Sequence, residues 1–171
     1  MLADDEAEGA VAVAEEQTEG RGRLGRSWEA PAGTSVLVSV LLLPTIEAAR
    51  LPELSLVAGG AVAEAIGEVT GIEPAIKFPN DVLIDGRKVA GILAESSKGR
   101  VVLGIGVNVN QTAEQLPAQT ETPPTSLRIE TGHEVARAPL LAAILERLGA
   151  DYVEWLREAQ GAAGVSGRVL R

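Results

Sequence analysis

The residues best suited to chemistry lie in the segment 17–28, which reads QTEGRGRLGRSW. Arg21, Arg23 and Arg26 alternate there with glycines, although the chain as a whole carries a net charge of −9. A guanidinium group is a permanent cation whose planar fork fits carboxylates and phosphates, and glycine lets the backbone approach a ligand closely. The segment therefore predicts a loop that binds a small anion, with Trp28 offering a flat face for a heterocycle. The alternative is a solvated surface loop with Trp28 buried in the core.

A dinucleotide or P-loop site is a poor explanation of the same segment. The GxxxxGK[ST] pattern is absent from the chain, and a GxGxxG match at Gly20–Gly25 is followed by no βαβ unit with a helix start. Arginine side chains, rather than the amides of a helix terminus, are therefore expected to hold the anion.

A second cluster, KFPND at residues 77–81, stands directly before a hairpin signal. Asp85-Gly86 between two apolar runs favours a two-residue type I′ turn. Counting back from that turn sets Asp81 opposite Ala90 and makes Lys88 its diagonal neighbour on the same face, about 7–8 Å away.

An ammonium and a carboxylate at that spacing can flank a ligand. Asp81 could recruit Mg²⁺, and Lys88 could neutralise a group in transfer. The alternatives are an ordinary Pro-Asn-Asp turn and a surface ion pair that contributes under about 1 kcal/mol.

A third cluster is the glycine-rich strand segment Gly104-Ile105-Gly106-Val107-Asn108. Strand glycines mark the close approach of a ligand or of another backbone, or else a bulge. His133 is the single histidine and cysteine is absent, so a His-containing triad or a His/Cys metal site has no support. His133 is expected in a loop, and Thr125-Ser126-Leu127 is typical of a helix cap.

The elements that must position these clusters follow from the apolar pattern. Pro52 and Gly71 are start and stop signals for a helix, and a second helix has apolar residues at helical spacing. The expected strands are 9–15, 35–43, 73–78, 82–84, 87–95 and 100–110, and the expected helices are 52–71 and 139–160. Residues 112–125 are expected to form a loop, and 161–171 a weakly structured tail. Strands outnumber helices and connect partly by hairpins, which predicts an α+β fold with a mixed, largely antiparallel sheet flanked by helices.

Composition bounds the class of protein. A chain of 171 residues, 46% of them apolar, is sufficient for one domain with a real core. Disulfides are excluded, no apolar run approaches 18 residues, and the acidic N-terminus is unlike a signal peptide. We therefore expect a cytoplasmic protein with no membrane partner. The acidic balance also argues against nucleic acid as a partner.

Taken together, the three clusters resemble those of biotin–protein ligases, also called biotin–[acetyl-CoA-carboxylase] ligases. EGRGRLGRSW, KFPNDVLIDGRKVAGILAE and VVLGIGVNVN occur in that family's order and spacing, and the resemblance covers about residues 9–152. It implies a fold like the catalytic core of class II aminoacyl-tRNA synthetases. It also implies a two-step reaction: biotin and MgATP give biotinyl-5′-AMP and pyrophosphate, and a lysine of a biotin carboxyl carrier domain then displaces AMP.

The resemblance also implies site residues. Arg23 and Lys88 would be catalytic. The biotin side would comprise Gln17, Gly20, Arg21, Gly22, Arg23, Lys88, Gly91, Gly104 and Gly106. The ATP or adenylate side would comprise Arg26, Trp28, Lys77, Asn80, Asp81 and Asn108, with Asp81 as the Mg²⁺ ligand. One departure is Phe78, which stands where the family has tryptophan and which keeps an aromatic plate.

The same resemblance divides the chain into a catalytic domain, 1–160, and a tail, 161–171, leading toward a small C-terminal β-barrel. That barrel and an upstream Ser-Thr-Asn segment that contacts biotin in the family are not recognised in this sequence. No winged helix is recognised either. The expected partners are biotin, ATP and the carrier domain of acetyl-CoA carboxylase or a related carboxylase, and a homodimer is compatible with the pattern. Two alternatives stay open: a biotin or biotinyl-AMP binding module with impaired catalysis, and a lipoate–protein ligase.

Overall fold

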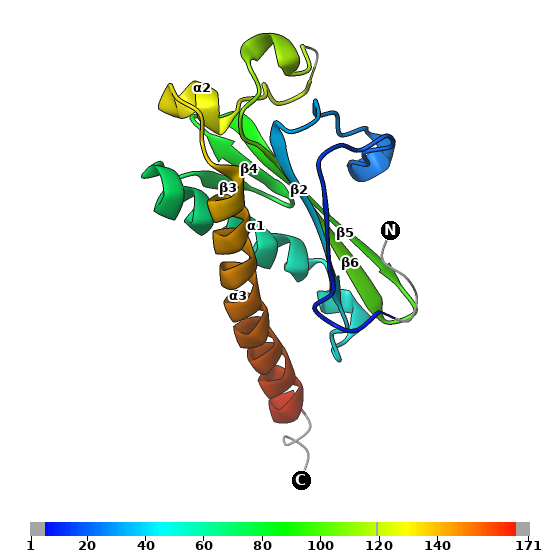
Figure 1. The fold of residues 1–171 in the computed structure, drawn as a ribbon. Coiled ribbons are helices and arrows are strands. Elements are labelled where there is room, and N and C mark those ends of the chain that lie inside the picture. The colour runs from blue at the N-terminus through cyan, green and yellow to red at the C-terminus, as the bar shows by residue number, and fades with distance from the viewer. Residues whose placement is uncertain (1–5, 119, 167–171) are drawn as a thin grey trace.

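A six-stranded sheet forms the centre of the molecule in the computed structural model, which describes residues 6–118 and 120–166 (Figure 1). The strand order is β1-β2-β6-β5-β4-β3, and every pair of neighbouring strands is antiparallel. The bounds are β1 Val11–Ala14, β2 Ser35–Leu42, β3 Ala75–Lys77, β4 Asp81–Ile84, β5 Arg87–Ser97 and β6 Arg100–Asn108. The expected α+β class with a largely antiparallel sheet is confirmed.

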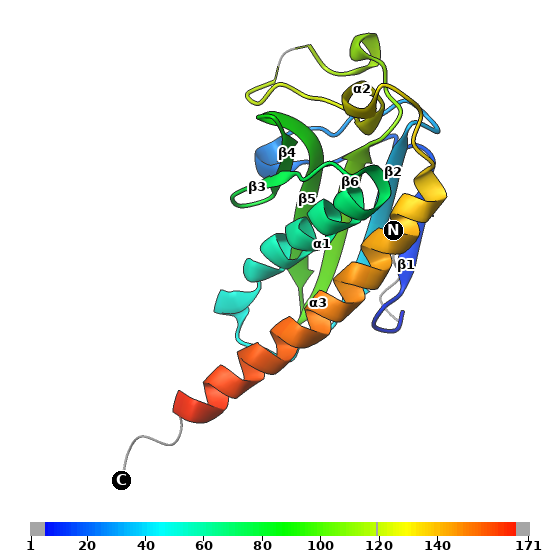
Figure 2. The same cartoon turned by 90° about the vertical axis from the view of Figure 1, so that its left-hand side faces the viewer.

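Two helices cover one face of this sheet, as Figure 2 shows. α1 (Glu53–Thr70) contacts β3, β4 and β5, while α3 (Arg137–Ser166) runs along α1 and reaches β2. α1 begins after Pro52 and ends at Gly71, which has the left-handed φ of 75° that glycine adopts without strain. The short α2 (Leu127–Thr131) starts at Ser126, whose hydroxyl accepts the Ile129 N–H, so the predicted cap is confirmed. His133 lies in the connection between α2 and α3, as expected.

Successive side chains along a strand point to opposite faces of the sheet, so one face packs in the core and the other is left for a binding site. The even residues of β2 and the odd residues of β6 are buried under the helices, among them Val38, Leu103 and Ile105. The opposite face carries Ser39, which lies across from Gly104. The helices therefore leave this second face of the sheet to the loops.

The β4–β5 hairpin corrects one expected pairing. Asp85 and Gly86 both have positive φ, 48° and 76°, which fits the predicted type I′ turn. The register then shifts between Val82 and Leu83, so Asp81 lies opposite Gly91 and not opposite Ala90. A β-bulge of this kind sets two residues against one and cannot be counted from the turn alone.

The tail beyond Gly161 corrects a second expectation. α3 continues through Ser166, so residues 161–166 are helical and not weakly structured. Alanine, the strongest helix former, stands at 162 and 163, and helix growth from an existing end is easy. These factors outweigh the cost of Gly161. Residues 167–171 of the predicted tail lie outside the described residues.

Candidate adenylate-forming site

A cleft of about 1690 Å³ lies on the face of the sheet that the helices leave uncovered. It is bounded by the segment 17–29, by β2, β5 and β6, and by the connection 117–124. All the predicted site residues except Gly20 line it: Gln17, Arg21, Gly22, Arg23, Arg26, Trp28, Lys77, Asn80, Asp81, Lys88, Gly91, Gly104, Gly106 and Asn108. Gly20 lines an adjoining hollow together with Arg21, Arg23 and Arg26. The three sequence clusters therefore meet at one place.

Backbone hydrogen bonds join the two ends of the Arg/Gly loop, residues 20–28. The Trp28 N–H donates to the Gly20 carbonyl at 2.9 Å, and the Gly22 N–H donates to the Arg26 carbonyl at 2.6 Å. A Cβ added at Gly20 would lie 2.0 Å from the Trp28 oxygen, so that position has no room for any other residue type. The glycines of the loop thus close the turn that presents the arginines.

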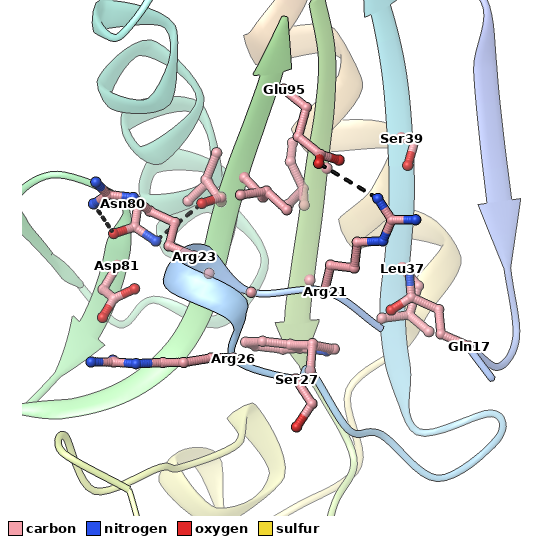
Figure 3. A pocket seen from close by; sticks show the side chains of 18 of the residues that line it. Gln17, Arg21, Arg23, Arg26, Ser27, Leu37, Ser39, Asn80, Asp81 and Glu95 are labelled. Carbon is pink, nitrogen blue, oxygen red and sulfur yellow. Dashed lines mark hydrogen bonds and ion pairs between the residues drawn. The ribbon is translucent and has the colours of Figure 1, made fainter. Parts of the chain in front are cut away.

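The three arginines leave this loop in different directions (Figure 3). Arg23 donates to the Asn80 side chain at 3.2 Å, and Arg21 lies 3.7 Å from Glu95 of β5. Arg26 lies 2.7 Å from Glu121 in the connection 117–124. The hydrogen bond from Arg26 and its charge lower the pKa of the Glu121 carboxyl. Each arginine thus lies beside an oxygen of a residue on a different wall of the cleft.

Lys88 and Asp81 form a direct ion pair. The Lys88 Nζ lies 2.7 Å from Asp81 Oδ1, and the two side chains are 27% and 18% exposed, so this is not a loose surface pair. Lys88 Nζ also lies 5.7 Å from the centre of the Trp28 ring, within the range of a cation–π contact. Lys88 therefore connects the hairpin to the Arg/Gly loop.

A flat glycine floor supports the Trp28 indole. Gly91 and Gly106 are directly paired between β5 and β6, and the bulge adds Asp81 to the same row. A Cβ at Gly106 would lie 2.7 Å from Trp28 Cε2, and one at Gly91 would lie 3.0 Å from Trp28 Cζ3. These two glycines, expected to face the biotin rings, lie against the indole here. The assignment of Gly91, Gly104 and Gly106 to biotin stays a prediction.

The nucleotide-side residues divide into two groups. Lys77 donates to Thr122 at 2.8 Å, and the Asn80 amide donates to the Ile92 carbonyl at 3.1 Å, so both lie at the rim between β3, β5 and the connection 117–124. Asn108 is different because it is 5% exposed and donates to the Thr125 carbonyl at 3.0 Å. The Trp28 Nε1–H donor is buried and has no acceptor among the described residues, so it is available to donate a hydrogen bond to a ligand.

Several residues that line the cleft were not predicted as part of the site, among them Ser39, Glu95 and Glu121. Ser39 interrupts the apolar run 36–42 of β2, and Glu95 continues the odd-numbered face of β5 that starts at Gly91. Alternation could have identified both. Glu121 stands in an aperiodic Pro- and Thr-rich segment, where no pattern predicts a contact with Arg26.

The charged side chains of the cleft do not form a complete metal-binding site among the described residues. Within residues 6–118 and 120–166, no group of three or more His, Cys, Asp or Glu side chains could hold a metal ion. Among the helices of that same part of the chain, none is long and apolar enough to cross a membrane.

Comparison with known proteins agrees with this geometry. The chain is 41% identical over 154 residues to the bifunctional ligase/repressor BirA of Bacillus subtilis, and the match covers 85% of this chain and 47% of that protein. It is 38% identical to the biotin–[acetyl-CoA-carboxylase] ligase of Mycobacterium tuberculosis, over 86% of this chain and 56% of that protein. The chain thus spans about half the length of these curated relatives.

A solved structure matches over most of the fold. The biotin protein ligase of Aquifex aeolicus in complex with biotin and ATP superimposes with a TM-score of 0.82 at 36% identity, covering 91% of this chain and 65% of that one. The model of the biotin/lipoate A/B protein ligase family matches residues 2–111, which is more than half of the sequence. The chain therefore belongs to the biotin/lipoate A/B protein ligase family.

Proposed function

We propose that this protein is a biotin–protein ligase that activates biotin with ATP and transfers it to a lysine of a biotin carboxyl carrier domain. The observation that carries the proposal is the single cleft in which the Arg/Gly loop, the Lys88–Asp81 pair and the Gly91–Gly106 floor meet. The solved Aquifex aeolicus relative contains biotin and ATP. Its fold matches 91% of the residues of this chain.

The cations of the cleft suit the first step. A biotin carboxylate oxygen attacks the α-phosphorus of ATP, the bond to the β-phosphate oxygen breaks, and pyrophosphate leaves. Two anions must approach each other, so the barrier falls when fixed positive charges surround them. Arg23 and Lys88 are the residues we assign to this task, and Arg26 is assigned to the phosphates.

The second step needs no nucleophile from this chain. The carrier lysine amine attacks the acyl carbon of biotinyl-5′-AMP, AMP leaves with the electron pair, and the amine loses a proton. Retention of the adenylate until the carrier arrives is assigned to Arg21, Arg23 and Trp28. The carrier domain is proposed from the chemistry that the relatives' names describe.

Magnesium fits this site as the partner of ATP. Mg²⁺ in such sites is held by one or two carboxylates together with substrate phosphates, and it neutralises the phosphate charge. Asp81 is the carboxylate proposed for it, because it lies beside Lys88 on the glycine floor. The absence of a larger acidic cluster among the described residues agrees with a metal that enters with the nucleotide.

Biotin-dependent exchange of pyrophosphate into ATP tests the proposal. We expect exchange that requires biotin, followed by a mass increase of one biotinyl group on a purified carrier domain. Tight biotin binding without exchange or mass increase would instead support a binding module. Exchange with lipoate in place of biotin would support a lipoate ligase, and the absence of binding of either acid would contradict all three functions.

A further inference from the structure

A closed ring of buried hydrogen bonds lies behind the Lys88 end of the cleft. Gln111, which is 0% exposed, donates through Nε2 to Asn108 Oδ1 at 3.0 Å and to Ser35 Oγ at 2.7 Å. Asn108 Nδ2 donates to the Thr125 carbonyl at 3.0 Å. The Ser126 hydroxyl donates to the Gln111 carbonyl at 2.7 Å, which closes the ring.

The chemistry of this ring fixes the direction of both amides. The Thr125 carbonyl can only accept, so Asn108 must turn its NH₂ group toward Thr125 and its oxygen toward Gln111. Gln111 must then offer its own NH₂ group to Asn108. A donor at residue 111 is therefore required for Asn108 to hold the Thr125 carbonyl.

The segment 123–125 in turn holds the backbone of Lys88 on both sides. The Lys88 N–H donates to the Pro123 carbonyl at 2.7 Å, and the Thr125 N–H donates to the Lys88 carbonyl at 2.8 Å. This parallel bridge lies two residues from the hairpin turn and directly beside the bulge, because the β4–β5 register shifts just beyond the Leu83–Lys88 pair. Lys88 thus depends on the segment 123–125 as well as on its own hairpin.

We propose that Gln111 is a positioning residue that fixes the Lys88 backbone through Asn108 and the segment 123–125. Gln111 does not line the cleft and touches no substrate in this account. The catalytic consequence rests on the proposed function of Lys88 in adenylate formation, whereas the structural link stands on the hydrogen bonds alone.

Gln111→Met tests this link because it keeps the length of the side chain and removes both donors. We expect backbone amide hydrogen exchange at Lys88 and Thr125 to accelerate about tenfold, the factor expected for one buried hydrogen bond, while Val38 in β2 is unaffected. Biotinyl-5′-AMP formation in a single turnover should slow about tenfold as well. Gln111→Glu, which keeps the shape and replaces the donor by an acceptor, should give the same results if the Met variant fails to fold.

Asn110→Ala is the matched control. Asn110 is adjacent in sequence and exchanges two hydrogen bonds of 2.9 Å with Val135, and it has no hydrogen bond to the segment 123–125. The Asn110→Ala variant should therefore leave backbone amide exchange at Lys88 unchanged.

A second comparison separates positioning from general destabilisation. If Gln111 acts through Lys88, Gln111→Met should slow adenylate formation less than twofold in a Lys88→Ala background. An equal loss in both backgrounds, or unchanged amide exchange at Lys88, would overturn the proposal. A parent chain that makes no biotinyl-5′-AMP would contradict the proposed function, and amide exchange at Lys88 would still decide the positioning.

Discussion

The floor of the cleft depends on two residues without side chains. Gly91 and Gly106 are paired across β5 and β6, and the Trp28 indole lies on them at a distance that leaves no room for a Cβ at Gly106. The same row continues to Asp81, whose carboxylate lies 2.7 Å from the Lys88 ammonium group. The stacking face, the carboxylate and the ammonium group are thus placed by one line of residues across the sheet.

Gly106→Ala should displace the Trp28 indole because the added Cβ would lie 2.7 Å from Cε2. We expect a shift of Trp28 fluorescence in a Trp155→Phe background and a marked loss of biotin-dependent pyrophosphate exchange. Gly104→Ala is the control for the fluorescence, because its Cβ would meet only Leu93, at 3.6 Å or more. Equal spectral shifts in the two variants would refute the stacking.

The Glu121 carboxylate pairs with Arg26, the residue that we assign to the phosphates of ATP. Its lowered pKa, caused first by the hydrogen bond from Arg26, shows that the carboxylate form is favoured there. Glu121→Gln should therefore lower the KM for ATP about two- to fivefold, the scale of an exposed ion pair, and leave the KM for biotin unchanged. Glu114→Gln, which lies before the connection 117–124 and does not line the cleft, should change neither constant. An increase in the KM for ATP in Glu121→Gln would show that Glu121 helps to bind the nucleotide.

At the scale of elements, the secondary structure that depends on local sequence patterns was predictable. The strands, the helix from Pro52 to Gly71 and the Asp85-Gly86 turn all follow from alternation and from turn or cap residues. The bulge after Val82 and the extension of α3 past Gly161 were not, because each depends on tertiary pairing or on cooperative growth of a helix. The contact of Glu121 with Arg26 spans 95 residues and has no local signature.

The far half of α3 is attached by Glu53 of α1, which accepts from Arg50 at 2.8 Å and from Trp155 Nε1 at 2.8 Å. These contacts, that of Arg50 first, lower the pKa of Glu53. Ionised Glu53 therefore contributes stability that is complete above the ordinary glutamate pKa and is lost as pH falls through the lowered value. Glu53→Gln should lower Tm by a few degrees at pH 7, and the gap from the parent should narrow in acid.

Glu154→Gln on the exposed side of α3 is the comparison for that experiment. It should leave both Tm and its acid dependence close to those of the parent. A constant gap between the parent and Glu53→Gln from neutral to acid pH would mean that the charge of Glu53 does not hold α3.

At the scale of the whole molecule, one face of the sheet serves the core and the other serves the cleft. α1 and α3 cover the first face, so loops that are distant in sequence can meet on the second. The order of the three motifs was sufficient to predict the family, and the family match over residues 2–111 confirms it. The roles of individual site residues need the chemistry itself to test them, because the chain spans about half of its curated relatives.

The most direct test is a single turnover of purified protein with biotin and MgATP, with biotinyl-5′-AMP measured by mass spectrometry. The parent chain should form about one adenylate per active site, and Lys88→Ala should slow its formation by about 100-fold or more, the scale of one electrostatic group in a transition state. Arg23→Ala should form the adenylate but release it faster. No adenylate from the parent, or normal formation by Lys88→Ala, would contradict the account.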